Sequence, residues 1–254
     1  MNFGRSRLPL LAAIVLTVAG CGSHGDSEPR QTAPSAGRWY AIPENVDYNV
    51  RWSAEPGIDL LSRPAVAVRA YMESYYLAIH GHALSAGYPG FADATSQQRD
   101  RVDFDHSNDQ ELEQLVGTQF EHLLAMTPAE DGWVATVCSG NYTVMAEKDG
   151  RYSNLTGPSP QAETVRMVAP EQAQSAASER IVAEGAERAP SADVFAGWTI
   201  SEHEPAARDQ NAYAECDSRM PDARDVRPQK ANLPHDSPYP TLAPYPGWPR
   251  YDEN

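Results

Sequence analysis

The sequence has no hydrophobic run long enough to cross a membrane. The longest, Leu8–Gly20, has 13 residues, whereas a bilayer core of about 30 Å needs about 20 helical residues. Arg5 and Arg7 precede this run, and no acidic residue does. A positive start followed by a short apolar run is typical of a cleaved secretory signal peptide. We therefore predict that residues 1–20 are a signal peptide.

Positive charge is also scarce. The chain has 20 Lys and Arg residues against 35 Asp and Glu residues, which gives a formal net charge of −15. Nucleic-acid binding depends on Lys and Arg side chains that neutralise phosphates, so we expect no nucleic-acid partner. The same balance excludes charge-driven binding to anionic lipid surfaces.

Motifs of known catalytic or metal chemistry are missing. There is no GxSxG, HExxH, P-loop or GxGxxG pattern. His80 and His82 are two residues apart, which on a helix points them about 200° apart, so they cannot share a metal there. The acidic stretch 103–109 resembles a calcium loop, but the positions that need Gly and Glu hold Asn108 and Gln114. We predict no catalytic residue, no cofactor and no metal site.

One of the chain's three cysteines directly follows the apolar run. The segment Val18–Cys21, "VAGC", resembles the lipobox of bacterial prolipoproteins. This resemblance implies cleavage before Cys21 and acylation of its thiol with diacylglycerol, typically bearing palmitate. The lipid bilayer is then a partner, and the protein is lipid-anchored on the extracytoplasmic face of the cell membrane. The alternative is an ordinary secreted protein with a chance cysteine at this position.

Lysine occurs only at positions 148 and 230, while arginine is plentiful. Such a bias is typical of G+C-rich genomes, and together with the lipobox it favours an actinobacterial source. The segment Gly22–Gly37 is small, polar and without apolar periodicity. This composition is typical of a flexible linker, and we predict a lipidated tether over residues 21–57.

If lipid occupies Cys21, the remaining cysteines are Cys138 and Cys216. Export places them in an oxidising compartment, and two cysteines allow only one pairing. A bridge would close a loop of about 78 residues and contribute about 4–5 kcal/mol in the chain-entropy model. Free thiols or a metal pair are the alternatives, but no CxxC pattern or histidine cluster accompanies these cysteines. We predict a Cys138–Cys216 disulfide.

A helix is predicted to begin after Ser62, a candidate N-cap followed by Pro64 in the first turn. The residues that step by three and four along one face are Ala65, Val68, Met72, Tyr75 and Ile79. Gly81 is a suitable stop.

Strands follow the helices along the chain. Residues 119–126 fit either a helix or a strand, and we favour a strand because their apolar side chains alternate. Asp149-Gly150 is a hairpin signal. The other predicted strands lie within 133–139, 141–148, 151–155, 163–169 and 195–204. Helices followed by an antiparallel meander predict one α+β domain over residues 58–217.

This order of elements is similar to that of the NTF2-like (SnoaL-like) families. The resemblance covers about 150 residues and implies N-terminal helices packed on a curved antiparallel sheet that forms a cone. Enzymes of these families use an Asp, His or Tyr inside the cone. No residue here matches a family motif, so the resemblance assigns no site.

The C-terminal segment 218–254 is rich in proline, with eight of the chain's 21 prolines between Pro221 and Pro249. We predict an extended or disordered tail with polyproline II character. Its repeated "PYP" and its aromatic residues could dock on an envelope protein or on wall glycan.

These patterns together predict a membrane-anchored envelope lipoprotein that is non-enzymatic and has a binding or scaffolding role. The alternative is an NTF2-like carrier or enzyme for a small hydrophobic ligand. The sequence identifies neither the ligand nor the partner.

Overall fold

The computed structural model describes residues 40–96, 112–171, 183–205, 210–229 and 234–250. The chain divides into two units, Met1–Gly37 and Arg38–Asn254, and the described residues all belong to the second. The predicted signal peptide, Cys21 and the acidic stretch 103–109 lie outside the described residues.

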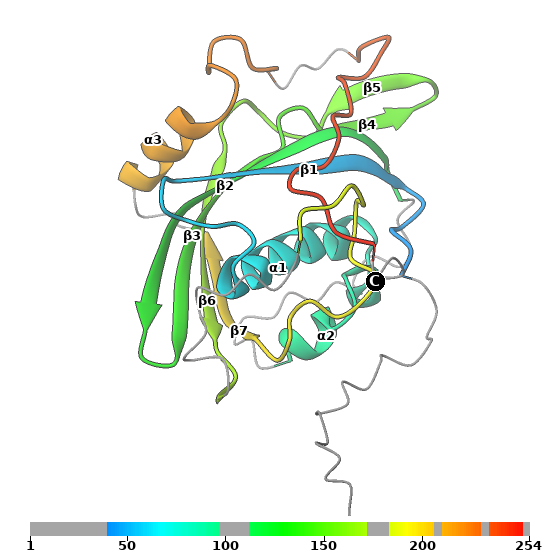
Figure 1. The fold of residues 1–254 in the computed structure, drawn as a ribbon. Helices are drawn as coiled ribbons and strands as arrows, with labels where there is room; N and C mark the ends of the chain where they lie inside the picture. The colour runs from blue at the N-terminus through cyan, green and yellow to red at the C-terminus, as the bar shows by residue number, and fades with distance from the viewer. Residues whose placement is uncertain (1–39, 97–111, 172–182, 206–209, 230–233, 251–254) are drawn as a thin grey trace, which may run out of the picture. The chain divides into compact units, whose positions relative to one another are not determined.

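The second unit is an α+β domain, as predicted, and its large sheet curls around a single long helix (Figure 1). Its helices are α1 (Arg63–His80), a 3₁₀ turn η1 (Leu84–Ala86), α2 (Phe91–Ala94) and α3 (Gln210–Arg219). Its strands are β1 (Val46–Ala54), β2 (Gln114–Ala129), β3 (Gly132–Gly140), β4 (Met145–Lys148), β5 (Arg151–Asn154), β6 (Gln161–Val168) and β7 (Thr199–Pro205).

Six of the sheet's seven strands lie in the order β5-β4-β2-β3-β6-β7, and all the pairs along this path are antiparallel. Strand β1 pairs with β2 in parallel. It comes before the helices and lies within the residues that composition placed in the tether, so the domain begins earlier than residue 58. Trp52 on β1 is buried in the core.

Residues 119–126 belong to β2 and are therefore a strand, which confirms the choice made from alternation. Leu123 faces α1 in the main core, whereas Phe120 and Leu124 pack against a second apolar cluster on the other face. Gly117 has a φ of 118°, and a Cβ there would collide with the Thr143 carbonyl oxygen. Position 117 of β2 therefore requires glycine, both for its positive φ and for the close approach of the Thr143 carbonyl.

The predicted helix is α1, and it ends at Gly81 as expected. Ser62 occupies the N-cap position, but its hydroxyl donates to the Asp59 carbonyl and accepts no hydrogen bond from the helix N–H groups. The helix is buried on more than its apolar face, because the sheet covers one side of it and the C-terminal segment contacts another side through Pro246 and Trp248. Arg69 and Glu73 are consequently buried, with 0% and 4% exposure.

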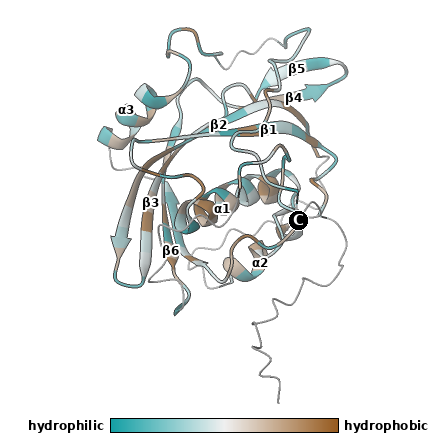
Figure 2. Cartoon of the chain, viewed as in Figure 1, coloured by the Kyte–Doolittle hydropathy of each residue, from teal (hydrophilic) through white to brown (hydrophobic). Residues whose placement is uncertain are grey.

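The domain has two apolar clusters. The larger fills the space between α1 and the concave face of the sheet, and Figure 2 shows hydrophobic colouring along α1 and the neighbouring strands. The smaller lies on the convex face under α3 and contains Cys138 and Cys216. These two cysteines form a disulfide, as predicted, and join β3 to α3.

The C-terminal segment 234–250 is extended and lies against the domain, crossing β1 (Figure 1). The prediction left open whether the tail is extended or disordered. Tyr245 forms a β-bridge with Arg51, and Trp248 forms one with Glu187. Trp248 is only 1% exposed, so the segment contributes a residue to the core. No helix among the described residues combines the length and hydropathy needed to cross a bilayer.

Candidate functional site

The concave face of the sheet carries a cluster of titratable side chains inside the domain. Glu121 on β2 and Ser139 on β3 are direct cross-strand partners. Glu163 on β6 and His203 on β7 continue the cluster across the sheet, and Tyr76 of α1 faces them. Strand alternation places these polar residues on the same face as core residues of the same strands.

Hydrogen bonds link the members of this cluster. The Ser139 hydroxyl donates to Glu121 Oε2 over 2.8 Å, and Gln119 Nε2 donates to Glu121 Oε1 over 2.5 Å. The Tyr76 hydroxyl donates to Glu163 Oε1 over 2.9 Å, and His203 Nε2 lies 2.7 Å from Glu163 Oε2. Each carboxyl group therefore has two partners.

The two carboxyl groups differ in their electrostatics. Burial and the nearby charge of Glu163 raise the pKa of Glu121 well above its usual range. Burial also acts to raise the pKa of Glu163, but the hydrogen bond and charge of His203 outweigh it and lower that pKa. The pKa values of the two carboxyl groups are therefore shifted in opposite directions. Two carboxyl groups separated in this way can serve as an acid and a base.

Access to this acid–base cluster is narrow. The side chains of His203 and Glu163 are 5% and 8% exposed. The rings of Tyr75 and Tyr71 stand edge-on to the His203 ring, with centroids 4.5 and 5.3 Å away. Sequence analysis did not identify this cluster, although the signal was available as polar residues at inward-facing positions of predicted strands.

A third buried carboxylate, Glu73 of α1, is held by three aromatic donors. Trp52 Nε1 and Trp248 Nε1 each donate over 2.8 Å, and the Tyr88 hydroxyl donates over 2.6 Å. Burial raises the pKa of Glu73, against the lowering effect of the Arg69 charge. These donors come from β1, the region near α2 and the tail, so Glu73 joins three distant parts of the chain.

Arg69 fastens the same end of the tail. Its Nη2 donates to the Pro246 carbonyl over 2.6 Å, and its guanidinium lies 4.5 Å from the centroid of the Trp248 ring. Its closest approach to Glu73 is 4.0 Å. The Arg69–Glu73 pair thus serves as an anchor for the tail.

On the convex face, a serine, a histidine and a carboxylate form a hydrogen-bonded chain. Ser53 Oγ lies 2.8 Å from His122 Nδ1, and His122 Nε2 lies 3.3 Å from Glu55 Oε1. With its proton on Nε2, His122 accepts from the Ser53 hydroxyl at Nδ1 and donates to Glu55 at Nε2. Glu55 also pairs with Arg219, whose hydrogen bond lowers the pKa of Glu55. These contacts link Arg219, at the end of α3, to the paired strands β1 and β2.

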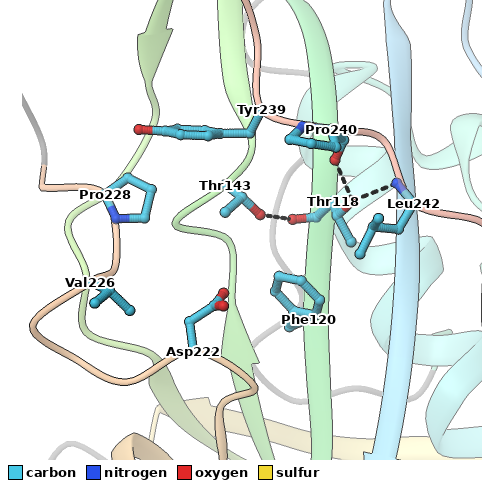
Figure 3. Close-up of a pocket in the computed structure, with 9 residues that line it drawn as sticks. All are labelled: Thr118, Phe120, Thr143, Asp222, Val226, Pro228, Tyr239, Pro240 and Leu242. Atoms are coloured by element: carbon cyan, nitrogen blue, oxygen red, sulfur yellow. Dashed lines mark hydrogen bonds between the residues drawn. The ribbon is translucent and has the colours of Figure 1, made fainter.

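The convex face also carries an open pocket of about 320 Å³ (Figure 3). Its lining comes from β2, the loop after β3, the segment after α3 and the tail: Thr118, Phe120, Thr143, Asp222, Val226, Pro228, Tyr239, Pro240 and Leu242. We call this the outer pocket. The tail forms one side of it through Tyr239, Pro240 and Leu242.

Hydrogen bonds hold the tail side of the outer pocket in place. Thr118 Oγ1 donates to the Pro240 carbonyl over 2.9 Å and accepts from the Leu242 N–H over 2.9 Å. The Thr143 hydroxyl donates to the Thr118 carbonyl over 2.5 Å. The acidic group of the lining is Asp222, whose Oδ2 accepts from the Tyr142 hydroxyl over 3.1 Å.

The histidine pair considered from sequence lies at the end of α1. Burial, aided by the nearby His82, lowers the pKa of His80 to about 4, and His82 follows with a φ of 51°. The structure brings no third ligand to them: among the described residues, no group of three His, Cys, Asp or Glu side chains could hold a metal ion.

Comparison with known proteins gives no relative. No family model, no curated protein and no solved structure matches this chain. No other protein's functional residues can therefore be carried over, and the candidate sites rest on the geometry of this chain.

Proposed function

We propose that this chain is a lipid-anchored protein of the bacterial cell envelope with a non-enzymatic binding or scaffolding role. Acylated Cys21 would hold it on the outer face of the plasma membrane. The outer pocket and the tail that forms it would supply the binding surface, for an envelope protein or wall glycan.

The observation that supports the binding role is that the interior of the domain is filled by side chains, whereas an open pocket lies on its outside. The concave side of the sheet, where a cone would hold a small ligand, is occupied by α1 and by fully buried large side chains such as Trp198, Tyr71 and Met72. The outer pocket, in contrast, opens on the convex face. The Cys138–Cys216 disulfide also fits an exported protein.

A Cys21→Ala variant tests the anchor. We expect the wild-type chain to partition into a detergent phase and the variant to remain an uncleaved precursor, because lipid attachment precedes cleavage in the proposed pathway. A Cys138→Ala/Cys216→Ala double variant, which keeps Cys21, is the matched control. Normal processing and detergent partitioning of Cys21→Ala would contradict the anchor.

A second function is supported by the acid–base cluster. Buried carboxyl groups with opposite pKa shifts are a common feature of catalytic sites. This favours an NTF2-like carrier or enzyme for a small hydrophobic ligand, with Glu121 as the acid and Glu163, with His203, as the base.

The two functions are separated by titration with a neutral apolar fluorophore, N-phenyl-1-naphthylamine. The binding role predicts no saturable uptake into the interior. Saturable one-to-one uptake that changes in Glu121→Gln and Glu163→Gln variants would favour the carrier or enzyme instead.

A further inference from the structure

The outer pocket combines apolar walls with one carboxylate. Phe120, Val226 and Leu242 provide apolar surface, and Pro228 and Pro240 add rigid faces. In Figure 3 the ring of Tyr239 lies across one side of the pocket, and the carboxylate of Asp222 points inward from the opposite side.

Asp222 differs from Asp217 because its carboxylate forms no ion pair among the described residues. Asp217 pairs with Arg224 over 3.2 Å and with Arg227 over 2.7 Å. Within the part of the chain that the structure describes, no basic side chain lies within 4.0 Å of the Asp222 carboxylate. Arg227 Nε donates to the backbone carbonyl of Asp222 over 2.8 Å, but the ion pair of Arg227 is with Asp217. The pocket therefore presents a carboxylate that has no ion pair of its own within the described part of the chain.

The rim of the pocket is apolar and exposed. Val226 is 70% exposed and Leu242 is 43% exposed, which is unusual for large apolar side chains on this domain. The volume is at the low end for ligand pockets, so it suits one or two side chains. A polypeptide can fill the pocket and also cover the apolar rim, whereas a small amine would leave the rim exposed.

Aromatic rings on this face already accept guanidinium groups from the chain itself. The Arg227 guanidinium lies 5.3 Å from the centroid of the Tyr142 ring, and Arg51 lies 5.5 Å from that of Tyr245. Cations are attracted to the faces of such rings. Tyr239 offers the same kind of wall to a cation that approaches Asp222.

We propose that the outer pocket binds a peptide segment of a partner protein in which an arginine or lysine is flanked by apolar residues. The cation pairs with Asp222 and lies beside Tyr239, and the flanking residues cover Val226 and Leu242. The chain's net charge of −15 favours the approach of a basic partner. This inference rests on the proposed binding role and adds the chemistry of the partner.

The test uses the isotope-labelled full-length chain in detergent micelles and a blocked leucine–arginine–leucine peptide. We expect amide shifts centred on Thr118, Thr143 and Val226. Replacing arginine with citrulline, which is neutral and similar in shape, should weaken binding about fivefold, as should Asp222→Asn, because both remove one half-exposed ion pair.

A pair of exposed leucines provides the matched control. Leu242→Ser should weaken binding, whereas Leu112→Ser should not, because Leu112 is 39% exposed but lies outside the pocket lining. Equal binding of the citrulline peptide would overturn the cationic ligand, and so would an absence of shifts. Pocket shifts that grow with protein concentration alone would identify a second copy as the occupant and also overturn it. None of these results affects the Cys21 test.

Discussion

The carboxyl groups inside the domain and the Asp222 carboxylate of the outer pocket differ in their partners. On the concave side, Glu73, Glu121 and Glu163 are buried, and each has at least two hydrogen-bond partners. On the convex side, the Asp222 carboxylate lies in an open pocket, accepts a hydrogen bond from the Tyr142 hydroxyl, and forms no ion pair with any described residue. A buried polar group without partners is costly, so the inner groups stabilise the fold, whereas the outer group remains available to a partner.

The largest expected effect comes from breaking the inner anchor of the tail. Trp248→Ala removes a fully buried ring and its bond to Glu73, and we expect the free energy of unfolding to fall by about 3–5 kcal/mol. Denaturant unfolding measures this. Leu242→Ala, in the exposed part of the same tail, should change stability by less than about 0.5 kcal/mol. Equal effects of the two variants would mean that the tail is not anchored through the core.

The next effect concerns the covalent link on the convex face. Replacing Cys138 and Cys216 with alanine should lower stability by about 2–4 kcal/mol, because the unfolded chain regains its freedom. Thermal unfolding with and without reductant checks this. Reductant should shift the wild-type midpoint and leave the double variant unchanged. A wild-type midpoint that does not respond would show that the thiols are not bridged.

Glu121 and Glu163 should make the free energy of unfolding depend on pH in opposite directions. The raised pKa of Glu121 favours the folded state most at pH values below the unfolded glutamate pKa, and this stabilisation is lost as pH rises. The lowered pKa of Glu163 has the opposite sign, since its stabilisation is lost as pH falls.

Glu121→Gln should therefore remove a decline in stability above about pH 4.3, of at most about 1.4 kcal/mol per pH unit. Glu163→Gln should remove part of the loss at acidic pH and lower stability near neutrality. Unfolding free energies from pH 3 to pH 8 measure both. Identical pH profiles for the two variants would contradict the opposite assignments.

The smallest effect is expected at the outer pocket. Asp222→Asn should change the free energy of unfolding by less than about 0.5 kcal/mol, because the group is partly exposed and has no ion pair. The same variant should weaken peptide binding, as described above. A large loss of stability would mean that Asp222, like the inner carboxyl groups, has a structural role, which would contradict the comparison.

Several parts of the fold follow from local patterns. The α1 periodicity and its Gly81 stop were sufficient to predict the helix. Asp149 and Gly150 have φ values of 54° and 73°, which a two-residue hairpin turn requires. The Cys138–Cys216 bridge was predicted because a lipid on Cys21 leaves only one pair.

Other parts depended on contacts distant in sequence. Strand β1 follows a polar segment, and its place beside β2 depends on pairing with residues about 70 positions later. Glu73 and Trp248 are 175 residues apart, so no local pattern links them. Glu121 and Glu163 could have been noted as inward-facing polar residues, but their opposite pKa shifts depend on His203, which a third strand supplies.

Local sequence patterns were sufficient to predict the short-range features: the anchor, from the signal and lipobox patterns, the helix, the hairpin and the even pair of cysteines. These depend on the order of neighbouring residues, which periodicity and turn chemistry report directly. The burial of Trp248 in the core and the place of Asp222 in a pocket, with no ion pair among the described residues, became visible only in the tertiary structure. The burial of a side chain and its hydrogen-bond or ion-pair partners depend on which distant segments come into contact. The same local sequence is compatible with an exposed or a buried side chain.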